Sequence, residues 1–120
     1  MRLRAALLAL ALLLPAVPVT PVAAQSADVV NVISHVAHVY GVPVERMVCV
    51  ARLESTFRPW VTSAAGHRGL WQWSDGTWAW ASVQAGYPDT SPYDLVASSY
   101  VAGWLMAQGG WAHWSVSPFC

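Results

Sequence analysis

The stretch that decides the fold runs from Glu54 to Gln72 and reads ESTFRPWVTSAAGHRGLWQ. Just before it, Met47, Val50 and Ala51 recur with Glu54 at helical spacing, which predicts a helix with Glu54 near its end. The carboxylate shares a face with three apolar side chains, so burial should disfavour its charged form and raise its pKa, as a general acid requires. The alternative is a helix end at which Glu54 points into water. The glycines and prolines that follow predict an ordered loop.

The rest of the chain reads as helices joined by loops, so the expected fold class is mainly α. A first helix is predicted over 26–40, capped by its serine and ended by Gly41. A second helix should start near Pro43. The last helix is predicted over 91–108, and Asp94 is expected to serve as a capping group and not as a catalyst. The apolar stripe of the first helix comprises Val29, Ile33, Val36, Ala37 and Tyr40.

The N-terminus has the pattern of a secretory signal peptide. Arg2 and Arg4 precede an apolar run over 5–14, and Val22-Ala23-Ala24 resembles a small-residue cleavage site. The apolar run is about half the roughly 20 residues that a membrane-spanning helix needs, so an uncleaved anchor is the weaker alternative. We therefore expect a signal peptide over 1–24 and one small domain over 25–120, with no stable membrane association after cleavage.

Charge and cysteine usage narrow the class of protein further. Without Arg2 and Arg4, four arginines face six acids and lysine is absent, which argues against nucleic acid as a partner. The chain has two cysteines, Cys49 and Cys120, and in an exported protein they are expected to pair. Such a bond would close a loop of about 70 residues and contribute roughly 4 kcal/mol. Unpaired thiols are the alternative. A metal site is not expected, because neither cysteine has a second Cys or His at ligand spacing.

The stretch 54–72 resembles the signature of the lytic transglycosylases and goose-type lysozymes of the lysozyme-like superfamily. That signature runs Glu-Ser-x-Phe-x-Pro, then Ser, then Ala-Gly-x-x-Gly-Leu-x-Gln, and ten of these 19 positions match without a gap. The resemblance implies a small lysozyme-like helical domain with a catalytic cleft. It also implies that Glu54 is the catalytic acid and that Ser63 and Gln72 contact the saccharide, and we expect the same of Ser55.

Aromatic residues supply further candidates for substrate contacts. Trp71 and Trp73 flank Gln72, and flat indole faces suit stacking on sugar rings. The resemblance extends loosely to Tyr100, which begins a partial counterpart of the family motif Tyr-Asn-Ala-Gly, with Val101 in place of the Asn. A core tyrosine is the alternative at that position. Other tryptophans, such as Trp78, are expected to pack in the core.

The mechanism depends on whether a second carboxylate assists Glu54. Asp75 is the candidate, although it also precedes a helix and could be an N-cap. If Glu54 works alone, the resemblance implies a lytic transglycosylase that cleaves the β-1,4 bond after N-acetylmuramic acid and forms 1,6-anhydro ends. If Asp75 assists, a hydrolytic lysozyme is the alternative. A third hypothesis is a non-catalytic peptidoglycan-binding module of the same fold.

These inferences define what the protein should bind and where it should act. The expected partners are peptidoglycan glycan strands. No cofactor is expected, and the expected oligomeric state is a monomer. The expected location is secreted or associated with the cell wall, in the periplasm or outside the cell.

Overall fold

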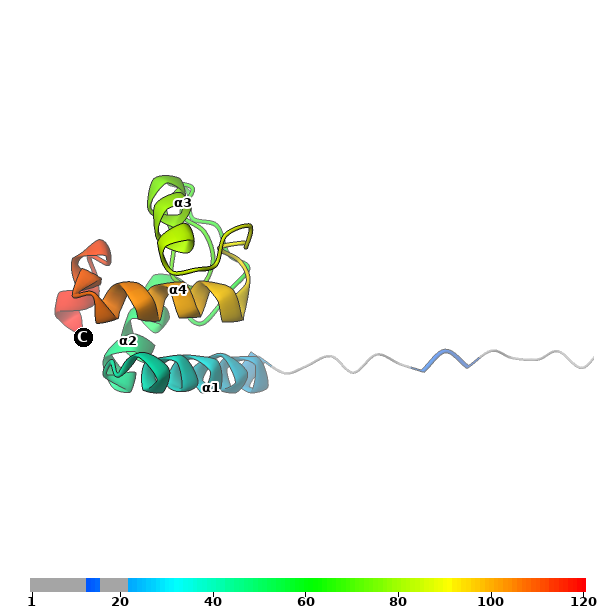
Figure 1. Ribbon diagram of the computed structural model, residues 1–120. Coiled ribbons are helices and arrows are strands. Elements are labelled where there is room, and N and C mark those ends of the chain that lie inside the picture. The colour runs from blue at the N-terminus through cyan, green and yellow to red at the C-terminus, as the bar shows by residue number, and fades with distance from the viewer. Residues whose placement is uncertain (1–12, 16–21) are drawn as a thin grey trace, which may run out of the picture.

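A computed structural model of the chain describes residues 13–15 and 22–120 and is mainly helical, as predicted (Figure 1). Its elements are α1 (Val22–Tyr40), α2 (Val44–Ser55), α3 (Asp75–Gln84), α4 (Leu95–Ala107) and two short 3₁₀ helices, η1 (Gly110–His113) and η2 (Ser117–Phe119). Within the described residues, extended pairing is limited to the isolated bridges Thr62–Arg68 and Arg68–Trp73. Most of the predicted signal peptide, residues 1–12 and 16–21, lies outside the described part. None of the described helices is both long and apolar enough to cross a membrane.

The helix α4 lies between α1 and α3, and α2 packs against α1 (Figure 1). The predicted stripe of α1 is confirmed, because four of its five members are buried and Tyr40 is half-buried. Each large aliphatic side chain in such a core contributes roughly 1.5–3 kcal/mol through its burial. The fully buried large side chains of α1, α2 and α4 are Ile33, Val36, Met47, Val50, Val101 and Met106.

Gly103 permits the close approach of α1 and α4. A Cβ at this position would lie 2.6 Å from Cγ1 of Val36 and 2.7 Å from Cδ2 of Tyr40. No side chain fits that gap without displacing its neighbours. The glycine of the partial Tyr-x-Ala-Gly motif therefore has a packing role at this helix crossing.

Three helix starts differ from the predictions. The helix α1 begins at Val22 and not at Ser26, since the alanines that follow Val22 favour helix. The N-cap of α3 is Ser74, whose Oγ accepts a hydrogen bond from the Thr77 N–H, so Asp75 is the first helical residue and not the cap.

The start of α4 was also predicted too early. The hydroxyl of Ser91 accepts the Tyr93 N–H within a turn, and the helix begins only at Leu95. Asp94 is its N-cap and accepts the Ala97 N–H at 2.8 Å, which confirms the predicted capping role of Asp94.

Candidate active site

Glu54 lies half-buried in the last turn of α2 and lines a cleft of about 280 Å³. Two groups of residues enclose this cleft. We call Glu54, His67, Gln72, Trp73, Ser74 and Thr77 the signature wall, and Ala112, His113, Trp114 and Ser115 the C-terminal wall. Among the residues that the structure describes, Glu54 is the one acid that lines the cleft, and hydroxyl, amide and indole groups surround it. Such a lining offers both hydrogen bonds and flat apolar faces, which a sugar ring requires.

Burial raises the pKa of the Glu54 carboxyl above its ordinary value of 4.5, and the nearby His67 opposes this by lowering it. The raised pKa agrees with the prediction made from helical spacing. A carboxyl that keeps its proton to higher pH can serve as a proton donor.

An unusual turn follows Glu54 at the end of α2. Thr56 and Phe57 both have positive φ angles, 53° and 58°, which are uncommon for residues other than glycine. The turn is held by Ser55, whose Oγ donates to the Ala51 carbonyl and accepts from the Arg58 N–H. Ser55 is 2% exposed and does not line the cleft. Both hydrogen bonds of its hydroxyl are made within the protein.

The loop after this turn positions His67 and Gln72. Gly69 has a φ of 78°, and a Cβ there would lie 2.1 Å from the Pro92 carbonyl oxygen, so only glycine fits. Gln72 lines the cleft, and its Nε2 donates to the Gly69 carbonyl at 2.9 Å. Ser63 does not line the cleft; its Oγ accepts the His67 N–H at 3.1 Å and so orders the loop beneath that residue.

The two tryptophans predicted to flank the substrate differ in position. Trp73 lines the cleft although it is only 2% exposed. Trp71 is completely buried, and its Nε1 donates to Ser99 Oγ at 3.1 Å. Its side chain belongs to the core and does not line the cleft. The Trp71 carbonyl instead accepts the indole N–H of Trp114 at 2.9 Å, which supports the opposite wall.

Tyr100 and Asp75 also lie outside the cleft lining. The ring of Tyr100 packs among Tyr40 and Tyr87, which favours the core alternative over a substrate contact. Asp75 is 85% exposed and forms an ion pair with Arg68. The structure therefore groups Glu54 with Gln72 and Trp73 and leaves out Ser55, Ser63, Trp71, Asp75 and Tyr100.

The model of the Transglycosylase SLT domain family matches residues 31–109, which is more than half of the chain. The chain belongs to the Transglycosylase SLT domain family. SLT domains act on peptidoglycan, so the family supports an activity of the lytic-transglycosylase type in general. No curated protein and no solved structure matches the chain.

The C-terminal wall follows the end of the SLT match at residue 109. The residues of this wall were not predicted as site residues. Trp114 could not be assigned a role from the sequence, and His113 lies in no motif. Their place in the cleft depends on how the chain folds back after α4.

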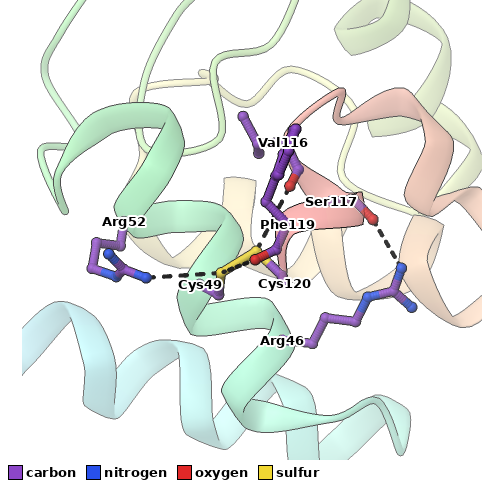
Figure 2. Close-up of a disulfide and its surroundings, with 7 residues drawn as sticks. All are labelled: Arg46, Cys49, Arg52, Val116, Ser117, Phe119 and Cys120. Atoms are coloured by element: carbon purple, nitrogen blue, oxygen red, sulfur yellow. Dashed lines mark hydrogen bonds between the residues drawn. A yellow bond between two sulfur atoms is a disulfide. The ribbon is translucent and has the colours of Figure 1, made fainter.

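Two residues of α2, Cys49 and Arg46, hold this C-terminal segment of the SLT chain (Figure 2). Cys49 and Cys120 form the predicted disulfide across 71 positions. One turn earlier in α2, the Nη2 of Arg46 donates to Ser117 Oγ at 2.9 Å, and its guanidinium lies 4.1 Å from the ring centroid of Trp111. The helix that carries Glu54 thus also anchors the segment that faces it.

Proposed function

We propose that the protein is a secreted peptidoglycan lytic transglycosylase that cleaves the β-1,4 bond between N-acetylmuramic acid and N-acetylglucosamine. The observation that carries the proposal is the half-buried Glu54, with its raised pKa, in the cleft of an SLT-family chain. Residues 25–120 would form the active domain after removal of the signal peptide. The substrate is the glycan strand of peptidoglycan, encountered in the periplasm or outside the cell.

In the first step, protonated Glu54 donates its proton to the glycosidic oxygen, and the bond from that oxygen to C1 of the muramic sugar breaks. Burial supports this role because it keeps the carboxyl protonated at a higher pH than water would allow. By resemblance to the family, the acetamido group of the sugar supports the positive charge that develops at C1. The departing strand leaves with the proton as a free hydroxyl.

In the second step, the Glu54 carboxylate takes the proton of the C6 hydroxyl of the same sugar. The oxygen then bonds to C1 and closes a 1,6-anhydro ring, so no water is consumed. Glu54 returns to its protonated form for the next cycle. One carboxyl therefore acts as acid and then as base, which suits a cleft in which Glu54 is the single acid from the described part of the chain.

The hydrolytic alternative needs a second group to activate water or to hold the sugar. Asp75 is its candidate, but the exposure of Asp75 and its pairing with Arg68 support a structural role at the start of α3. Asp75→Asn distinguishes the two mechanisms. If Glu54 works without a second carboxylate, this substitution should lower kcat by less than about tenfold. If Asp75 is catalytic, kcat should fall by more than about a hundredfold.

Digestion of purified sacculi tests the whole proposal. Fragments released by the mature protein should carry 1,6-anhydro ends when analysed by mass spectrometry. Reducing ends would instead indicate a lysozyme, and binding without release would indicate a non-catalytic module. Because the disulfide is part of the folded protein, the enzyme should be prepared oxidised.

A further inference from the structure

The Glu54 cleft is small for a polymeric substrate. Its volume of about 280 Å³ lies just below the roughly 300–1,000 Å³ of ordinary small-molecule sites. Only a short length of a glycan strand can lie in it. Sugars further along the strand must cross the surface beside the cleft, so a favourable surface at either end would add to binding.

Such a surface lies beside the C-terminal wall. Trp80, on α3, stacks on His113 with ring centroids 6.1 Å apart and planes inclined by 26°. The ring of Trp104, on α4, meets Trp80 edge-on at 5.9 Å. We call Trp80, Trp104 and His113 the aromatic ledge.

Two independent links connect the ledge to the cleft. His113 belongs to the aromatic ledge and also lines the cleft. Thr77 lines the cleft as well, and Trp80 follows it by three positions on α3, so the two side chains lie on the same face of that helix. The ledge therefore continues the cleft along α3.

The exposed part of Trp80 suits a sugar. Trp80 is 47% exposed even though its ring stacks on His113 and forms a T-shaped pair with Trp104. Its neighbours hold the indole in place, so little rotational freedom would be lost on binding. A flat, fixed apolar face beside a saccharide cleft fits the apolar C–H face of a pyranose ring.

We propose that Trp80 forms an additional saccharide subsite, in which the exposed part of its indole ring stacks on a sugar of the same glycan strand beyond the units held in the Glu54 cleft. This inference rests on the proposed function and specifies how the enzyme recognises its substrate. It assigns Trp80 to the binding of long strands and not to bond cleavage.

The test compares Trp80→Ala with Trp60→Ala, which removes a tryptophan that is 60% exposed and does not line the cleft. Peptide-free glycan strands from sacculi, separated by length, are the substrates. Trp80→Ala should lower kcat/KM about tenfold on long strands through KM, and the loss should shrink as the strand shortens to a tetrasaccharide. Trp80→Phe, which keeps an aromatic face, should recover most of the loss, and Trp60→Ala should show no dependence on length.

A direct binding measurement separates this inference from the proposed function. In the inactive Glu54→Gln background, calorimetry should show about tenfold weaker binding of long strands when Trp80 is also replaced by alanine. If both proteins bind equally, the subsite is refuted while the cleavage activity still stands. An equal loss on short and long strands would also refute it, because Trp80 would then act only by holding His113. Absence of any glycan binding or cleavage would overturn both proposals.

Discussion

The turn and loop that carry the signature wall contain hydrogen bonds between residues 3 to 11 positions apart, whereas the segment that carries the C-terminal wall is held by contacts that span 43 to 71 positions. In the first, Ser55, Ser63 and Gln72 bond to neighbours in their own turn or loop. In the second, Trp114, Ser117 and Cys120 are fixed by Trp71, Arg46 and Cys49.

This difference matches a difference in the proposed roles of the two walls: one carries the catalytic group and the other closes the cleft. The wall with local bonds carries the proton donor, and its geometry follows from a short continuous sequence. The opposite wall closes the cleft and depends on long-range anchors, one of which requires an oxidising environment. Changes to the signature wall should therefore affect kcat, and changes to the anchors should affect stability and substrate affinity.

The largest effect is expected from Glu54→Gln. The amide cannot donate or accept the proton in either step, so kcat should fall at least about a thousandfold. Anhydro-end formation on sacculi measures this. Activity within tenfold of the wild type would show that the signature wall does not carry the chemistry.

Folding provides the control for this variant. Burial disfavours the charged carboxylate, so the native state of the wild type binds the proton more tightly than the unfolded state and loses stability as the pH rises above 4.5. Glu54→Gln should thus unfold at the same or a higher temperature than the wild type at pH 7. The difference should vanish below pH 4.5, where both side chains are neutral.

The second effect concerns the anchor of the C-terminal wall. Replacing Cys49 and Cys120 together by serine should lower the free energy of unfolding by about 4 kcal/mol, because the loop between them is no longer closed in the unfolded chain. Thermal unfolding should shift down by more than about 15 °C. KM should rise as the wall loosens. Dithiothreitol should have the same effect on the wild type and none on the double variant; an insensitive wild type would contradict the role of the anchor.

The third effect concerns the loop of the signature wall. Gly69→Ala forces a Cβ against the Pro92 carbonyl and an unfavourable φ, so stability should fall by about 2–4 kcal/mol. Gly66→Ala is the matched control, since Gly66 also has a positive φ but nothing lies within 4 Å of its added Cβ. Denaturant unfolding should show the smaller loss for Gly66→Ala. Equal losses would mean that the contact with Pro92 is unimportant.

The smallest expected effect is a shift of the pH–kcat profile, which should differ between the histidines of the two walls. His67 lowers the pKa of Glu54, so His67→Gln should raise that pKa further and move the alkaline limb of the pH–kcat profile to higher pH. His113→Gln, on the C-terminal wall, should leave the limb in place. A shift caused by His113→Gln and not by His67→Gln would reverse the assignment.

The sequence predicted features that depend on nearby residues. Helical spacing predicted the buried face of α2 and the raised pKa of Glu54, and the signature predicted the SLT family. Cysteine usage predicted the disulfide. Helix starts were less accurate, because several adjacent polar residues compete to be the cap, as Ser74 and Asp75 do before α3.

The tertiary structure alone decided which side chains meet at the cleft. Trp71 and Trp73 look alike in sequence, yet their side chains differ in surroundings, so that only Trp73 reaches the cleft. His113 and Trp114 carry no motif, and their positions follow from the return of the chain after α4 and from its anchors on α2. Trp80, on α3, also carries no motif, and its ring stacks on His113. Local sequence determines a helix, its apolar face and a proton donor, because these depend on residues a few positions apart. The opposite wall and the aromatic ledge depend on packing between distant segments, which no local pattern specifies.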